Sequence, residues 1–265
     1  MPASRVEKAE VMYSAPPQYH VRGAAINLVL KGYKPGEGGL QGEIRGEYKQ
    51  QKEAGGNGGV TLAYTSPKVD LDFMYNLQSS YTRGYIDFLA HHTVKGQMYD
   101  VNQVTEHTGR SLAHTLRAGG TYKFDADNSL ELSYTTQFSP SSQHHSHSSG
   151  SISESFNDSR THHQMHNAAL NYTSGFGFRA GADYTNFTST DTQNFFDRSP
   201  EEVETRFVSR SDQHIDRWKI YADQSHSLPH DWTLNYGTSF SYVYNRNIQD
   251  YDLPEMPGQN LYTRI

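Results

Sequence analysis

The chain of 265 residues contains no cysteine, which excludes a disulfide framework, a zinc–thiolate site and a thiol nucleophile. It also lacks any apolar run of about 18 residues, so the sequence excludes a membrane-spanning helix. Hydrophobic residues make up only 34% of the chain and the mean hydropathy is -0.80, which is too polar for a large soluble core. The formal net charge of -6 gives no reason to expect nucleic acid as a partner. Charged residues at 20% and aromatic residues at 12% nevertheless argue against simple disorder.

What the sequence does contain is a period of two in long segments between Leu40 and Tyr244. Apolar and polar residues alternate in 40–48, 69–81 and 232–244. Side chains alternate across a strand, so each segment predicts a strand that is wet on one face and apolar on the other. Strands of a soluble sandwich usually run about 5–6 residues. Segments of about 10 residues or more, with aromatics near their ends, favour a transmembrane β-barrel, whose outer face alone must be apolar.

The pattern predicts an all-β fold of about ten long antiparallel strands, with apolar faces outward and polar faces on the concave side. The expected strands are 39–49, 58–66, 69–83, 96–108, 111–124, 129–139, 162–173, 176–190, 205–227 and 231–247. Tight turns are expected around Pro67, Asp127, Gly175 and Pro229. Longer polar loops are expected at 50–57, 84–95, 140–161, 191–204 and 248–260. The two sets should lie at opposite rims, as in an outer-membrane barrel.

A motif near the N-terminus carries a family resemblance. The segment Val6–Val11 (VEKAEV) precedes Gly23–Lys31 (GAAINLVLK), a Gly-small-small-Ile-Asn-aliphatic-aliphatic-x-Lys strand. A Gly-rich step and an alternating strand with GEIRG at 42–46 follow. This order resembles the end of the plug and the start of the barrel in TonB-dependent outer-membrane receptors. It is most similar to the receptor-like barrel proteins common in Bacteroides-type bacteria, over about residues 4–48.

The resemblance implies two parts, with 1–35 as the C-terminal end of a plug-like domain and 36–265 as a partial outer-membrane β-barrel. Family members carry a signal peptide, a whole plug and about 22 strands. The chain is therefore expected to be a fragment or a truncated product that forms part of an incomplete larger barrel. Its first residues contain no apolar signal core, which for a barrel indicates that the true start is missing.

By this resemblance the intact protein is expected to lie in the outer membrane and to bind a nutrient at the cell surface for energy-coupled uptake. Its partners would be outer-membrane lipid, TonB in the full-length form, and an extracellular ligand such as a glycan, a metal chelate or haem. Such transport makes no covalent bond, so we nominate no catalytic residue and no cofactor. Two alternatives stay open: a soluble all-β carbohydrate-binding or adhesin protein, and an outer-membrane structural protein that transports nothing.

Histidines are the candidate metal ligands. Imidazoles at high density bind zinc, copper or haem iron, although no spacing here matches a fixed tetrahedral site. The segment 143–166 is expected to lie at the long-loop rim and to be poorly ordered without metal, since its composition offers little apolar area. A solvated loop is the alternative reading, and His91 and His92 form a second, weaker cluster. The candidate ligands are His144, His145, His147, His162, His163 and His166.

Carboxylates and aromatics are the remaining candidates. Asp70 and Asp72 would lie about 7 Å apart on one strand face, a separation that a glycosidase could use, but lining of a wet interior explains them better. Phe195, Phe196, Tyr251 and Tyr262, in the expected long loops, are candidates for stacking on sugar. Other aromatics are expected to form girdles at the membrane interface: Tyr64, Phe73, Tyr75, Tyr122, Phe124, Tyr134, Tyr172, Phe176, Phe178, Trp232, Tyr236 and Tyr242.

Overall fold

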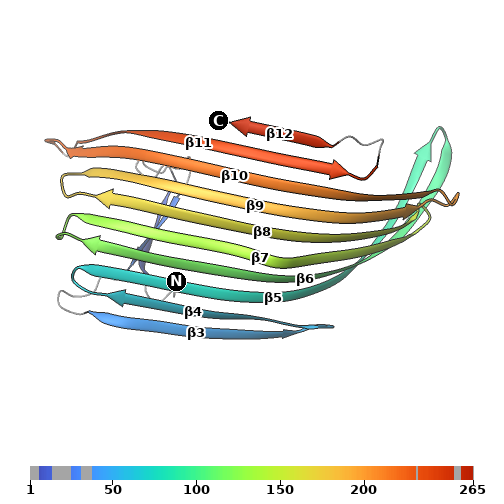
Figure 1. Cartoon of the computed structure of the whole chain (residues 1–265), viewed down its shortest axis with the longest axis horizontal. Helices are drawn as coiled ribbons and strands as arrows, with labels where there is room; N and C mark the ends of the chain where they lie inside the picture. Colours follow the sequence, from blue (N-terminus) through green and yellow to red (C-terminus); the bar gives the residue numbers. More distant parts are fainter. Residues whose placement is uncertain (1–5, 14–24, 31–37, 231, 254–257, 265) are drawn as a thin grey trace.

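The computed structural model describes residues 6–13, 25–30, 38–230, 232–253 and 258–264. Two short strands, β1 (Val6–Met12) and β2 (Ala25–Leu30), pair antiparallel in a sheet of their own. Figure 1 draws this pair behind the larger sheet. Both strands fall within the segment expected to be plug-like, whose assignment as a separate domain stays a prediction.

Ten further strands form one antiparallel sheet, in which each strand pairs with its neighbours in sequence (Figure 1). This confirms the all-β class with long antiparallel strands. The sheet is not closed, because β3 and β12 lie at its two edges. The strands are β3 (Gly39–Gln50), β4 (Ala54–Thr65), β5 (Val69–Val94), β6 (Gln97–Lys123), β7 (Ser129–Gly150), β8 (Glu154–Thr173), β9 (Phe178–Arg198), β10 (Glu204–Ser227), β11 (Thr233–Tyr251) and β12 (Gln259–Arg264).

The turns that follow β4, β6, β8 and β10 lie at one rim, which we call the short-turn rim, at the left of Figure 1. They contain Pro67, Asp127, Gly175 and Pro229, so the sequence predicted them correctly. In one of them, Asp125 accepts hydrogen bonds from the backbone N–H groups of Asp127 and Asn128 at 2.9 and 2.8 Å. These bonds lower the pKa of the Asp125 carboxyl below its ordinary value.

The connections that follow β3, β5, β7 and β9 lie at the opposite end, the far rim. Here the sequence was wrong about length. Most of the expected loop residues 84–95, 140–161 and 191–204 continue the strands, and only two to five residues separate each pair of strands, as at 95–96 and 199–203. The expected strands 96–108 and 111–124 are likewise one strand, β6. Pro254, also expected at this rim, lies outside the described residues.

A β-bulge in β7 changes which side chains share a face. Ser139 pairs with His163 and Ser142 with Thr161, so β7 holds one residue more than β8 between these pairs. The same extra residue appears against β6. Because side chains alternate, the insertion moves every β7 residue beyond Pro140 to the face opposite the one that its parity predicts.

The sheet has no apolar core among the residues that the structure describes. No hydrophobic side chain there is buried, and the buried residues are Thr136, Ser139, Ser174 and Ser209. Leu132 is 59% exposed and Tyr236 is 55% exposed. Among the described residues, therefore, no closed apolar core encloses Phe73, Leu132 or Tyr236.

Candidate functional site

One face of the ten-stranded sheet carries most of the apolar side chains in the half next to the short-turn rim, and we call it the aromatic face. The apolar residues of this face in the half of the sheet next to the short-turn rim form a zone that we call the apolar band. Paired residues in adjacent strands share a face, so strand register defines rows across the sheet. One row of apolar residues, interrupted by a single glycine, crosses β3 to β11: Leu40, Tyr64, Leu71, Gly120, Leu132, Leu170, Ala182, Ile220 and Phe240.

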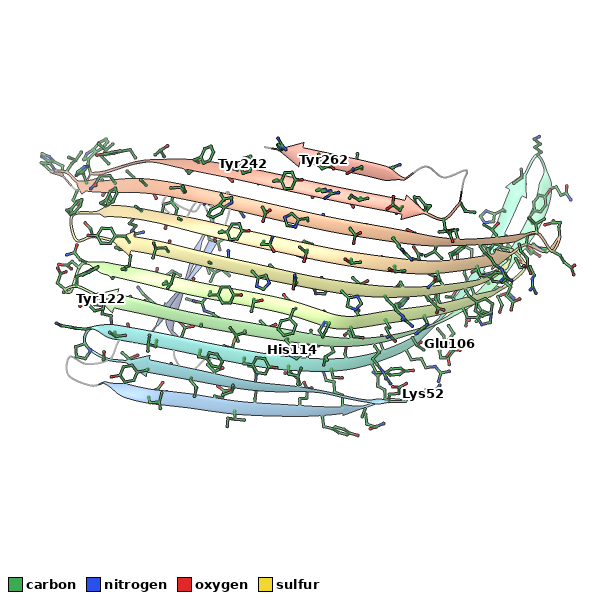
Figure 2. The ribbon with its side chains drawn as sticks, viewed as in Figure 1. Lys52, Glu106, His114, Tyr122, Tyr242 and Tyr262 are labelled. Carbon is green, nitrogen blue, oxygen red and sulfur yellow. The ribbon has the colours of Figure 1, made fainter. Side chains whose placement is uncertain are left out.

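Aromatic rings follow the edge of the apolar band at the short-turn rim. Tyr122 and Phe124 have ring centroids 5.1 Å apart, and Phe124 lies 6.5 Å from Tyr172. Tyr172 in turn lies 6.5 Å from Phe178, which stacks on Phe176 at 6.0 Å. Figure 2 labels Tyr122 at this end of β6. The rings thus link the ends of two successive hairpins along one rim.

A second aromatic edge lies toward the middle of the strands, where His114 is labelled in Figure 2. The Tyr75 hydroxyl and His114 Nδ1 are 2.8 Å apart, and the His114 ring stacks on Phe138 with centroids 4.4 Å apart. The Tyr134 hydroxyl and His166 Nδ1 are also 2.8 Å apart. Each hydrogen-bonded pair joins an amphipathic ring to a polar ring on the same face. The edge continues on later strands with Tyr184, Trp218 and Tyr244.

Beyond this second edge, the aromatic face becomes charged, and we call this zone the polar extension. Arg83 Nη2 lies 2.6 Å from Glu106 Oε1, and the Tyr85 hydroxyl donates to the same oxygen at 3.2 Å. The hydrogen bond from Arg83 lowers the pKa of the Glu106 carboxyl. Near the far rim, Arg198 pairs with Glu204 at 3.0 Å and lowers the pKa of that carboxyl in the same way. The aromatic face is therefore divided into an apolar half and a charged half.

The opposite face, which we call the polar face, carries ion pairs even beside the apolar band. Asp70 lies 2.6 Å from Lys123 Nζ, and Asp72 lies 3.1 Å from Arg117 Nε. The two carboxylates considered for a glycosidase are thus each paired with a cation of β6. Several buried side-chain oxygens of this face have no hydrogen-bond partner within the described chain: those of Asn57, Asp70, Asn76, Gln103, Asn157 and Asn245.

A tyrosine ties three strands together on the polar face. The Tyr221 hydroxyl of β10 donates to Asn171 Oδ1 of β8 at 2.7 Å, reaching across β9. Its ring covers Gly181 of β9, where an added Cβ would lie 2.6 Å from both Tyr221 Cε1 and Asn171 Oδ1. The glycine therefore leaves the space that the ring occupies. Beside it, a cavity of about 500 Å³ near the short-turn rim is lined mainly by polar residues, among them Thr173, Arg179, Asp223, Asn235 and Ser239.

His162, His163 and His166 lie on β8, as the expected strand 162–173 predicted, whereas His144, His145 and His147 lie on β7 and not in a loop, which corrects that part of the expectation for 143–166. Register places His145, His147, His162 and His166 on the aromatic face. His163 of β8 lies on the polar face by alternation, and His144 lies there because of the bulge in β7. His145 pairs with Asp158 and His166 with Tyr134, so both have partners other than a metal. Among the described residues, no group of three or more His, Cys, Asp or Glu is placed to hold a metal ion.

The four aromatics proposed for sugar stacking also separate. Phe196 and Tyr262 lie on the aromatic face, where arginine side chains cover their rings. Phe195 and Tyr251 lie on the polar face, and Phe207 of β10 stands between them. The Phe195–Phe207 centroid distance is 5.0 Å and the Phe207–Tyr251 distance is 6.3 Å. Sequence reasoning missed Phe207. Its position in the expected strand 205–227, on the same face as Ser209 and Ser211, was a usable signal.

Comparison of the chain with family models, with curated proteins and with solved structures found no match. The described residues include no helix long and apolar enough to cross a membrane. The two faces of the sheet and their contacts are therefore the basis for assigning a function.

Proposed function

We propose that this chain is part of an outer-membrane receptor or transporter, with the apolar band in contact with lipid and the polar face lining a wet interior. The observation that carries the proposal is the inverted distribution of polarity. The described sheet buries no hydrophobic side chain, while Leu132, Ile220 and Phe240 of the central row are 59%, 55% and 64% exposed. A contiguous apolar surface of this kind requires a cover, and hydrocarbon is a cover that needs no hydrogen bonds.

The dimensions of the band support lipid as that cover. On β7, the apolar residues of the aromatic face run from Leu130 to Phe138, which is about 27 Å along the strand. With a strand tilt of about 40°, this gives a height of about 20 Å, and the rings at both edges extend it toward the ~25 Å of outer-membrane barrels. Aromatic rings at both edges match the girdles of such barrels.

Strand length supports the same arrangement. β5 and β6 contain 26 and 27 residues, whereas about 9–11 residues are enough for a tilted strand to cross a membrane. The excess lies at the far rim, where the aromatic face is charged and paired, as at Arg83 and Glu106. Short turns face the periplasm in such barrels, which would place the polar extension outside the cell.

The resemblance of Gly23–Lys31 to the end of a receptor plug favours a receptor over an outer-membrane structural protein that transports nothing. An interior that carries Asp70–Lys123 and Asp72–Arg117 pairs would offer polar contacts to a plug or to a ligand. No observation on the described residues favours the soluble carbohydrate-binding alternative, because its apolar residues would need a buried core.

Site-directed spin labelling tests the lipid contact directly. Because the chain has no cysteine, single cysteines can be introduced at successive positions of β7 from 130 to 138 without removing a native thiol. After refolding into phospholipid vesicles, labels at 130, 132 and 134 should be relaxed by oxygen, which concentrates in lipid. Labels at 131, 133 and 135 should be relaxed by a water-soluble nickel chelate. Accessibility to the nickel chelate at all six positions would refute the membrane assignment and favour the soluble alternative.

A further inference from the structure

The polar face carries an aromatic platform near the far rim, formed by Phe195, Phe207 and Tyr251 on three adjacent strands. The three rings are only partly buried, so each keeps an accessible surface. The rings that border the apolar band lie on the opposite face, whereas Tyr221 and Phe187 lie on the polar face outside the platform. Rings placed together on the wet face, far from that band, have no role in contacting lipid.

Polar groups surround the platform, and the charged ones next to it are acidic: Asp197 lies two residues after Phe195 on the same face of β9, and Asp252 follows Tyr251. Asn157 of β8 pairs in register with Phe195, and its buried Oδ1 has no hydrogen-bond partner within the described chain. Gln193 and Ser209 lie in register with Tyr251, and Gln249, two residues before Tyr251 on the same face, has its Nε2 3.5 Å from Ser209 Oγ. A buried acceptor without a partner is costly, so Asn157 is poised for a donor that a ligand supplies.

The backbone holds the platform in a fixed place. The Asp252 carboxylate accepts a hydrogen bond from the Val208 N–H at 2.6 Å, and the Asp252 N–H donates to the Val208 carbonyl at 3.1 Å. This reciprocal pair fastens the end of β11 beside Phe207, one residue after Tyr251. A site with fixed rings loses less entropy when a ligand binds.

We propose that Phe195, Phe207, Tyr251 and Asn157 form a binding site for a neutral saccharide. The apolar C–H faces of a sugar ring stack on aromatic rings, and its hydroxyl groups donate to and accept from amide and hydroxyl side chains. The carboxylates of Asp197 and Asp252 disfavour the carboxylates of haem or of an anionic chelate, and no imidazole lies among Asn157, Gln193, Ser209 and Gln249. This inference rests on the proposed function, because it treats the polar face as the interior of a receptor open to the outside.

Saturation-transfer NMR on the full chain refolded in phospholipid vesicles tests the site. The probes are four neutral hexasaccharides (maltohexaose, cellohexaose, mannohexaose and xylohexaose), with hexagalacturonate and haemin as charged comparisons. We expect at least one neutral hexasaccharide to bind more tightly than either charged probe. Phe207→Leu, which removes the flat ring but keeps an apolar side chain, should weaken that binding about three- to tenfold.

Phe187→Leu is the matched control, because Phe187 lies on the same strand and face as Phe195 but outside the platform. It should bind like the wild type, and both variants must show the wild-type tryptophan emission in vesicles. Equal loss in both variants, tighter binding of a charged probe, or no neutral probe bound would overturn the inference. The spin-label pattern on β7 reports on the proposed function independently, so a failure of sugar binding in a correctly inserted chain refutes the saccharide site alone.

Discussion

A charge introduced at Leu132 should be tolerated in water but not in lipid. Leu132 lies in the central apolar row, between Gly120 and Leu170, and is 59% exposed. A substitution at so exposed a position of a soluble protein usually changes the free energy of unfolding by no more than about 0.5 kcal/mol. The same residue at the depth of the apolar band would meet hydrocarbon, where Arg costs about 2–4 kcal/mol near the bilayer midplane.

The measurement compares Leu132→Arg with the wild type in reversible urea unfolding from phospholipid vesicles. Trp218 and Trp232, the two tryptophans of the chain, report the transition through their emission. Leu132→Arg should lower the free energy of unfolding by about 2–4 kcal/mol, which corresponds to roughly a 30- to 700-fold change in the unfolding equilibrium constant. The slope of free energy against urea should not change.

Asn194→Arg is the matched control, because Asn194 is also exposed and shares the aromatic face. It lies in the polar extension, beyond the proposed membrane, where a new charge should change the free energy of unfolding by less than about 1 kcal/mol. If Leu132→Arg and Asn194→Arg have effects that agree within about 0.5 kcal/mol, the apolar band does not contact lipid and the depth assignment is wrong.

Three further predictions concern single contacts. Tyr221→Phe should lower the free energy of unfolding by about 1 kcal/mol, because the hydrogen bond to Asn171 is lost. Gly181→Val should lower it further, because the added Cβ would collide with the Tyr221 ring. Urea titration measures both changes. A variant with all six candidate histidines changed to Ala should bind zinc like the wild type at pH 7.5, as measured by calorimetry, because the sheet divides them between two faces; weaker binding by the variant would contradict this. Because the pKa of Glu106 is lowered, its pair with Arg83 stabilises the β5–β6 hairpin fully above pH 4.5, the ordinary pKa of the carboxyl. This contribution is lost as the pH falls through the lowered pKa. Amide exchange in 84–106 should show that Glu106→Gln removes this acid dependence.

The faces of the sheet could be predicted from the sequence because the side-chain period of a strand is two. Val69, Leu71 and Phe73 alternate with Asp70 and Asp72, and the register places the two sets on opposite faces. The same parity assigned the girdle aromatics that lie within strands to one face. Tight turns were also readable, since Asp125 and its neighbours supply side-chain acceptors that close the turn.

Strand ends were not readable in the far half, because those segments lack the apolar alternation on which the prediction depended. Residues 140–150 consist largely of Ser and His, and backbone pairing with β6 and β8 holds them in the sheet. A segment of this composition is disordered when it is isolated. Between β6 and β8 it is ordered, because its backbone N–H and C=O groups pair with the two neighbouring strands. The information that orders 140–150 therefore lies in its neighbours.

The bulge in β7 was also not predicted from the sequence, and it determines the face on which His144, His145 and His147 lie. Without it, His144 would share the aromatic face with Phe138, as their even numbers suggest. Pro140 was the available signal, because proline within a central strand is confined to bulges and edges. Reading that proline as a bulge would have placed His144 on the polar face and His145 and His147 on the aromatic face.

The open edges of the sheet set a condition on the proposed function. β3 presents Ile44 at 87% exposure and Tyr48 at 72%, and it pairs only with β4. In hydrocarbon, an unpaired strand edge leaves backbone N–H and C=O groups without partners, at a cost of several kcal/mol for each group. Under the proposed function, the apolar band and the open edges therefore have opposite requirements, since the band would contact lipid and the edges would have to avoid it. Both are met only if further strands pair with β3 and β12 and close the sheet around the polar face, which would then surround the aromatic platform of Phe195, Phe207 and Tyr251.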